Sequence, residues 1–242
     1  MPVTSQPSDL VYNPYAFSVH DDPYETYRRL RDEAPAYWND DLHFWALSHF
    51  DDVLEGFRDF ETFSSAGGIA LENRRAIDRR NPDLQQMIEL DPPEHTVFRK
   101  LVSRAFTGRR VAAMEHEIRA IVDGYLDRVV AAGECDLVDD ITGPFPKDVI
   151  SAVLGIPDND RDPLRHHADK ILIREDGSMA IPQAAADGMF GLLEYFVADL
   201  PRRRAGERSG LITDLLELEV DGRALTDEEL LGFCVLFVIA GH

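Results

Sequence analysis

Apolar residues recur with helical spacing along most of the chain, and this pattern predicts a mainly helical protein. Asp22 and Pro23 suit the first positions of a helix that ends before Pro35. The longest periodic segment, 111–132, carries an apolar stripe and is followed by Gly133, a residue typical of helix ends. Further helices are expected at 51–58, 94–106, 146–154, 160–174, 182–204 and 211–219.

Strand signals lie in two short segments near the N-terminus. Segments 36–38 and 44–48 are β-prone and flank an Asn-Asp-Asp turn, which predicts a hairpin. Segment 64–80 has no clean period and contains two adjacent glycines, so we expect a long loop or a broken helix there. The expected fold class is therefore mainly α with a small β-sheet.

The last segment of the chain predicts a buried helix. Thr226 is followed three residues later by Glu229, the spacing of a capping box. From 232 to 240 the sequence is apolar on every side, which is typical of a helix in the middle of a large protein. Because the sequence stops at His242 within this pattern, we expect a fold that is cut inside a central helix. The alternative is a C-terminal helix that is naturally buried.

Composition narrows the class of protein. The 242 residues are 44% hydrophobic, enough for one large domain or two small ones. A net charge of −20 repels nucleic acid and anionic membranes. The first ten residues are polar, and the longest apolar stretch is shorter than the roughly 20 residues of a membrane span. We therefore expect a cytoplasmic protein with no nucleic-acid and no membrane partner.

The metal-binding residue types lack the spacing of metal sites. The two cysteines, Cys135 and Cys234, are far apart, and we expect the first at the surface or in a strand and the second buried. The adjacent histidines at 166–167 point to different helix faces, and segment 115–117 lacks the second histidine of a zincin helix. No glycine-rich phosphate loop or GxSxG motif occurs. We expect no metal ligand and assign no catalytic residue.

The clearest local motif combines an imidazole and a guanidinium. His95 and Arg99 follow a double proline, and on a helix they lie about 40° apart on one face. Both side chains donate hydrogen bonds to carboxylates, so the pair suits a ligand with two carboxylates. The alternative is an ordinary solvated helix face.

A basic patch stands out in this acidic protein. Lys100 and Arg104 lie on the side of the helix opposite His95, and two further arginines follow. The patch consists of Lys100, Arg104, Arg109 and Arg110. It could dock an acidic protein partner, or it could only keep the surface soluble.

The motif and its neighbours resemble the bacterial cytochromes P450. Segment 91–107, DPPEHTVFRKLVSRAFT, resembles the family's C-helix signature. Segment 44–53 looks like its first hairpin and B-helix, and 60–65 like the segment that closes this helix. Segment 225–242 looks like the start of the I-helix. The resemblance covers nearly the whole chain but only somewhat more than the first half of the family's fold.

The resemblance implies a single incomplete cytochrome P450 domain over 1–242. His95 and Arg99 would bind the haem propionates, Ala240 and Gly241 would face the distal side of the haem, and Phe233 and Phe237 would line the substrate pocket. Segment 67–87 would roof this pocket, and helices 160–174 and 182–204 would form a mobile lid. The basic patch would dock a ferredoxin-type redox partner.

The family's activity is the insertion of one oxygen atom from O₂ into a small organic substrate, with haem as the cofactor. The acid-alcohol pair that the family has just after the positions of Gly241 and His242, the later Glu-x-x-Arg element and the cysteine loop that ligates iron are absent from this sequence, and neither Cys135 nor Cys234 has the right context. We therefore expect this chain to be inactive alone. Two alternatives stay open, a non-enzymatic helical haem-binding or interaction protein and an unrelated helical enzyme with a metal or small-molecule site.

Overall fold

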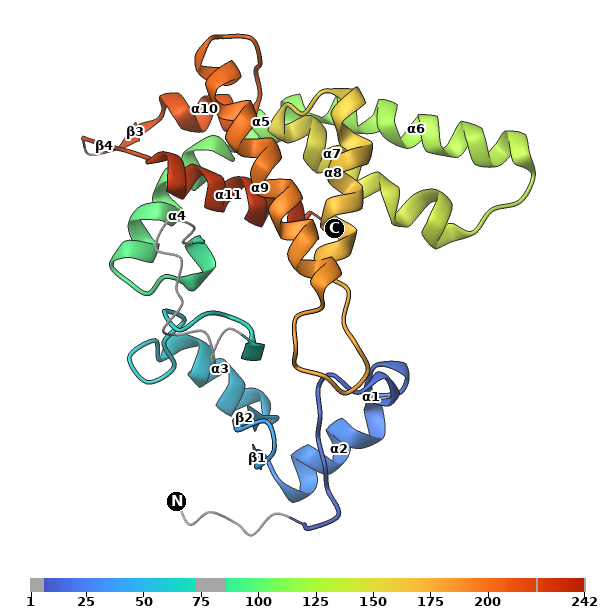
Figure 1. Ribbon diagram of the computed structural model, residues 1–242, viewed down its shortest axis with the longest axis vertical. Coiled ribbons are helices and arrows are strands. Elements are labelled where there is room, and N and C mark those ends of the chain that lie inside the picture. The colour runs from blue at the N-terminus through green and yellow to red at the C-terminus, as the bar shows by residue number, and fades with distance from the viewer. Residues whose placement is uncertain (1–6, 73–85, 221, 242) are drawn as a thin grey trace. The chain divides into compact units, whose positions relative to one another are not determined.

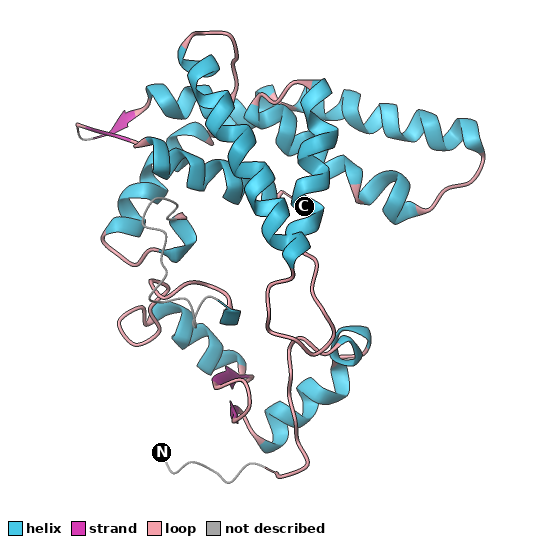
Figure 2. Ribbon diagram, in the orientation of Figure 1, coloured by secondary structure: helices cyan, strands magenta, loops and turns pink. Residues whose placement is uncertain are grey.

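The computed structural model describes residues 7–72, 86–220 and 222–241, and it is mainly α with small β-sheets, as predicted (Figures 1 and 2). The α-helices are α1 Phe17–Asp21, α2 Tyr24–Glu33, α3 Phe50–Arg58, α4 Glu94–Ala105, α5 Gly108–Ala113, α6 Glu115–Ala132, α7 Pro144–Leu154, α8 Asp158–Ile171, α9 Gln183–Arg204, α10 Leu211–Glu217 and α11 Asp227–Ala240. The strands are β1 Ala36–Asn39, β2 Phe44–Leu47, β3 Glu219–Val220 and β4 Arg223–Ala224. A 3₁₀ turn spans Met87–Glu89 and a π-helical turn spans Val138–Thr142.

The chain forms two compact units. The first falls within Met1–Arg80 and Ile173–Gln183, and the second within Asn81–Leu172 and Ala184–His242. Each unit has its own apolar core. The single domain expected over 1–242 stays a prediction.

The predicted hairpin organises the first unit. Strands β1 and β2 pair antiparallel, with Tyr37 opposite Ala46 and Trp38 opposite Trp45. Because side chains alternate between the faces of a strand, Tyr37 and Phe44 are buried on one face, while Trp45 is exposed on the other. The ring of Tyr12 meets the edges of Tyr37 and Phe44. Together with α2 these residues close a small core.

Helix α11 lies in the core of the second unit, as its all-round apolar sequence predicts. The capping box at its start is complete, since Thr226 Oγ1 accepts from the Glu229 amide and Glu229 Oε2 accepts from the Thr226 amide. Cys234 is fully buried, as expected. The residues that form this core come from α7 to α11, and they include Leu154, Leu164, Leu192, Phe196, Ile212, Leu215, Leu230, Cys234 and Val235.

One local expectation needs correction, and several short elements were not expected. The continuous helix expected over 111–132 is divided at Met114, whose amide donates to the Val111 carbonyl oxygen three residues earlier, so that the short helix α5 ends there and α6 begins. Gly133 ends α6 in the left-handed conformation, as predicted. Helix α1, the β3–β4 hairpin and the π-helical turn were not expected, because each is short. Most of the expected loop 67–87 lies outside the described residues.

Two glycine turns meet in the second unit. Gly155 ends α7 and Gly210 precedes α10, and both have positive φ, +72° and +111°. A Cβ atom on Gly155 would lie 1.8 Å from the Ser209 carbonyl oxygen, and one on Gly210 would lie 2.6 Å from the Cα of Gly155. Only glycine allows this approach of one backbone to the other.

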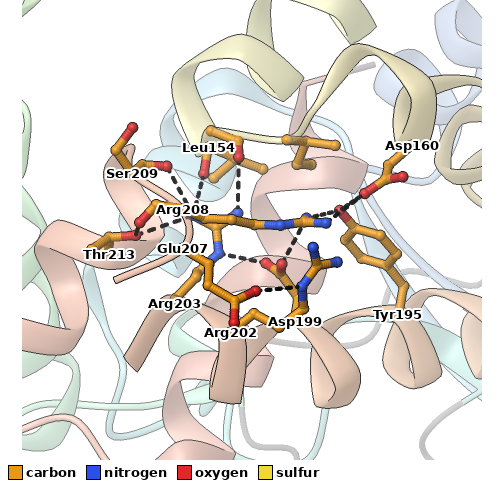
Figure 3. A network of polar contacts seen from close by, with 12 residues as sticks. Leu154, Asp160, Tyr195, Asp199, Arg202, Arg203, Glu207, Arg208, Ser209 and Thr213 are labelled. Carbon is orange, nitrogen blue, oxygen red and sulfur yellow. Dashed lines mark hydrogen bonds and ion pairs between the residues drawn. The ribbon is translucent and has the colours of Figure 1, made fainter. Parts of the chain in front are cut away.

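A buried arginine ties these turns together (Figure 3). Arg203 near the end of α9 is fully buried and forms an ion pair with Asp199 one turn earlier. Its guanidinium donates to the carbonyl oxygens of Leu154, Gly155 and Ser209 and to the Thr213 hydroxyl. This arginine therefore satisfies carbonyl groups that end α7 and precede α10.

The network extends to the start of α8 (Figure 3). Arg208 Nη1 lies 2.7 Å from Asp199 Oδ1, and its Nη2 donates to Asp160 at 2.9 Å. Tyr195 donates its hydroxyl hydrogen to Asp160 at 2.9 Å. Helices α8, α9 and α10 are therefore joined by a charged cluster as well as by the apolar core.

Candidate functional site

Helix α4 carries the imidazole–guanidinium pair. Pro92 and Pro93 precede its first residue, where proline's missing N–H costs no helical hydrogen bond. The inner face of α4 presents Phe98, Leu101 and Val102, all of which are buried. This packing fixes the rotation of the helix and therefore the direction of its other faces.

His95 and Arg99 lie one turn apart on α4. The side chain of His95 is half-buried and that of Arg99 is exposed. Within 7–72, 86–220 and 222–241, neither side chain has a hydrogen bond or an ion pair. Two unpaired donors of this kind form a set that fits two carboxylates.

The basic patch is exposed, but its members differ. Lys100, Arg104 and Arg109 are exposed. Arg110 donates to Asp214 of α10 at 2.5 Å, with both side chains a little over two-fifths exposed. The charge of Arg110 is therefore partly neutralised, and docking of a partner at this patch stays a prediction.

Two phenylalanines assigned to a substrate pocket lie on α11. The ring centroid of Phe233 is 5.8 Å from that of Phe98 on α4 and 5.9 Å from that of Phe237. Phe233 is 1% exposed and Phe237 is half-buried. The guanidinium of Arg223 covers the Phe98 ring at 4.7 Å. The structure thus places Phe233 within the packing of α4 against α11, and its role in a pocket stays a prediction.

Ala240 and Gly241 lie at the end of α11. Ala240 is exposed and Gly241 is half-buried. A Cβ atom on Gly241 would lie 2.7 Å from the Cβ of Ile150, so the backbone here packs closely against α7. Their position beside a cofactor stays a prediction.

Among the described residues, neither cysteine belongs to a group that could bind a metal ion. Cys135 is exposed, while burial raises the pKa of the Cys234 thiol and keeps it neutral. In the described part of the chain, no three His, Cys, Asp or Glu residues gather as a metal site. No helix of that part is long and apolar enough to cross a membrane.

A hollow of about 460 Å³ opens on the second unit. It is lined by Tyr125, Arg128, Asp148 and Arg165, among others. The Tyr125 hydroxyl donates to Asp148 at 2.5 Å, and Arg128 covers the Tyr125 ring at 4.2 Å. Charges of both signs already pair with one another here, so the hollow offers no clear preference for a ligand.

Sequence reasoning missed the buried charges of α9. Asp199 and Arg203 stand four residues apart, which is also the spacing of an ordinary surface pair on a helix. It considered His167 of α8 only as a metal ligand and missed that its ring lies against Gly191 of α9. The only signal for the first group is that an acidic residue interrupts the apolar face of α9.

No protein-family model matches the chain. The Mycobacterium tuberculosis protein assigned to cytochrome P450 123 is 38% identical over 234 residues, which cover 97% of this chain and 58% of the relative. Cytochrome P450 107B1 of Saccharopolyspora erythraea is 32% identical over 248 residues, which cover 99% of this chain and 60% of the relative.

Solved structures agree with these relatives. CYP268A2 of Mycobacterium marinum, in complex with pseudoionone, has a TM-score of 0.79 at 27% identity, and the match covers 100% of this chain and 62% of that one. A mutant of P450 EryK in complex with erythromycin B has a TM-score of 0.78 at 32% identity, covering 94% and 56%. The chain thus spans somewhat more than half the length of the proteins it matches. It belongs to the cytochrome P450 family and corresponds to the N-terminal portion of that fold.

Proposed function

We propose that this chain forms the propionate-binding and distal portion of a haem-thiolate monooxygenase. The observation that carries the proposal is the pair His95 and Arg99, two donors one turn apart with no partner in the described residues. Haem has two propionates, so this donor set fits it. When bound, haem supplies the chemistry that inserts one oxygen atom from O₂ into an organic substrate.

The residues of this chain would hold and orient the cofactor. Arg99 would bond one propionate through two parallel N–H groups, and His95 would donate to a propionate one helical turn away. The buried inner face of α4 would keep both donors in place, since Phe98 stacks on Phe233 of α11. At the end of α11, the single methyl group of Ala240 and the absence of a side chain at Gly241 would leave room on the distal side.

Names of relatives support a monooxygenase. Steroid C26-monooxygenase of Mycolicibacterium smegmatis is 29% identical over 254 residues. Cyclomarin C epoxidase of Salinispora arenicola is 33% identical over 218 residues. We infer a small organic substrate for the complete protein.

We infer that an acidic ferredoxin-type protein docks on the basic patch. All four side chains of the patch are exposed, and Arg110 also pairs with Asp214. In a protein with a net charge of −20, such a patch would steer an acidic partner to one face.

We also infer that neither cysteine is the axial ligand of the haem iron. The Cys234 thiol is enclosed by apolar side chains of α7 to α11, and Cys135 is exposed after the end of α6. The 242-residue chain would therefore hold haem weakly. A reduced, CO-bound spectrum of the thiolate type from this chain would contradict that inference.

The propionate role is tested with hemin and hemin dimethyl ester, which lacks free carboxylates. His95→Ala with Arg99→Ala should weaken hemin binding at least about tenfold, which is less than the loss of one charge-assisted hydrogen bond. Binding of the ester should not change. Lys100→Ala with Arg104→Ala, on the opposite side of α4, is the matched control.

Both pairs should also be made in the chain joined to the remaining segment of cytochrome P450 107B1, where haem retention is measured after gel filtration. Equal hemin affinity and equal retention for the two double variants would remove His95 and Arg99 from the site.

A further inference from the structure

Helices α8 and α9 approach each other through two glycines. A Cβ atom on Gly188 would lie 2.5 Å from the His167 carbonyl oxygen and 2.8 Å from the Cβ of Lys170. A Cβ atom on Gly191 would lie 2.1 Å from Nδ1 of the His167 ring. The imidazole of His167 therefore lies directly against the backbone of α9, in space that any other residue at 191 would fill.

One nitrogen of the His167 ring has no hydrogen bond to the described residues. Its Nδ1 is buried and has no partner among the described residues. Burial, the largest effect, lowers the pKa of His167, and Lys170 and His166 on the same helix lower it further. Glu194 of α9 acts in the opposite direction.

Other charges packed on α8 are already engaged. Helix α7 also packs against α8, and its charged residues Lys147 and Asp148 pair with Asp169 and Arg165 of α8. Glu194 is therefore the acidic group that acts on His167, and its side chain is exposed.

Protonation of His167 changes the number of hydrogen-bond acceptors that its ring requires. A neutral imidazole carries one N–H and can leave the other nitrogen without a donor, whereas imidazolium carries two N–H groups. With Nδ1 buried against Gly191, the second N–H would lack an acceptor, and a buried unpaired donor is unfavourable. The buried Nδ1–H group of the charged ring would reach water or the Glu194 carboxylate only if the ring left its position.

We propose that His167 is a proton-sensitive wedge of the α8–α9 crossing, which its neutral ring closes against Gly191 and its protonated ring loosens by moving toward Glu194. The direction in which stability depends on pH follows from the lowered pKa of His167. An unfolded histidine takes up its proton near pH 6.5, while His167 in the crossing resists protonation until a lower pH. The crossing therefore keeps its full stability above pH 6.5 and loses it as the pH falls below that value.

The first test is an NMR titration of the histidine ring protons in the 242-residue chain. His166 is the internal control, because it is exposed and adjacent in sequence. The two signals are assigned from His166→Gln and His167→Gln. We expect His167 to titrate at a lower pH than His166. Titration of His167 at the same or a higher pH would overturn the proposal, and this result needs no variant to fold beyond those used for assignment.

The second test is amide hydrogen exchange at pH 7.5 and 5.5, corrected for the intrinsic pH dependence of exchange. Wild type and His166→Gln should both lose protection in α8 and α9 at pH 5.5, while the core of α11 keeps its protection. His167→Gln cannot take up the proton, so its protection of α8 and α9 should not change between the two pH values. An equal loss in His167→Gln would refute the wedge.

Discussion

Replacing Arg203 by methionine should be among the most destabilising single changes in the second unit. The side chain is fully buried, and so is that of its ion-pair partner Asp199. The guanidinium also supplies hydrogen bonds to three carbonyl oxygens around the turns at Gly155 and Gly210 (Figure 3). Methionine keeps much of the apolar stem and removes all of these donors, so the loss is electrostatic rather than a cavity.

The magnitude follows from burial. Breaking a buried ion pair by removing one partner typically costs about 3–5 kcal/mol, because the remaining charge stays desolvated. Asp199 keeps a contact with Arg208 at 2.7 Å, whereas the carbonyl oxygens lose a charged donor. In a chain of this size about 1 kcal/mol lowers Tm by about 2–4 °C, so Tm should fall by roughly 6–20 °C.

The chain provides matched controls in the same arginine run. Arg202 pairs with Glu207, and Arg204 pairs with Asp227, and all four side chains are about half-exposed. Exposed pairs of this kind contribute about 0–1 kcal/mol. Arg202→Met and Arg204→Met should therefore shift Tm by only a few degrees.

The assay is thermal and urea unfolding followed by circular dichroism at 222 nm, with near-ultraviolet spectra to check that each variant is folded before the scan. A Tm of Arg203→Met equal to those of Arg202→Met and Arg204→Met would refute the reasoning. It would mean that water replaces the guanidinium at the two turns, so that Arg203 does not hold α9 to α7 and α10.

Two further substitutions test the packing of the second unit by urea unfolding. Gly155→Ala should destabilise the chain by more than the roughly 1–2 kcal/mol of a left-handed alanine, because its Cβ would also meet the Ser209 carbonyl oxygen. Gly133→Ala is the control, because Gly133 is also left-handed but has open space around it, so it measures the backbone effect alone. Equal losses would contradict the close approach of the two turns. Phe233→Ala should lower the free energy of unfolding by about 3–5 kcal/mol. Phe190 is 69% exposed, so Phe190→Ala should change it by no more than about 0.5 kcal/mol. A small loss for Phe233→Ala would show that its ring does not fill the space between α4 and α11.

Elements governed by neighbouring residues could be predicted from the sequence. The capping box at Thr226 and Glu229, the left-handed stop at Gly133 and the hairpin around 39–43 all depend on residues within a few positions of one another. The break at Met114 could not be predicted in this way, because the apolar spacing continues through it. Thr107 is a local signal for the start of α5, but it does not mark the break at Met114.

The buried ion pair shows why spacing alone cannot separate a core from a surface. Asp199 and Arg203 have the same separation as Arg28 and Asp32, which form an exposed pair on α2. The difference is that two glycine turns pack around Arg203, and these turns lie roughly 50 residues earlier and a few residues later in the sequence. Their carbonyl oxygens surround the guanidinium only after α7 and α10 have packed, so the burial is a tertiary property.

The residues of the candidate site show the same difference between local and tertiary properties. Helical periodicity puts His95 and Arg99 on one face of α4 and Lys100 and Arg104 on another, which requires only the rise and turn of a helix. Whether a cation is free to bind a ligand depends instead on what else folds beside it. Arg110 has the same local context as Arg109, yet it pairs with Asp214, 104 residues later in the chain. A patch of four cations in the sequence therefore acts with fewer in the folded chain, and a partner should depend more on Arg109 than on Arg110.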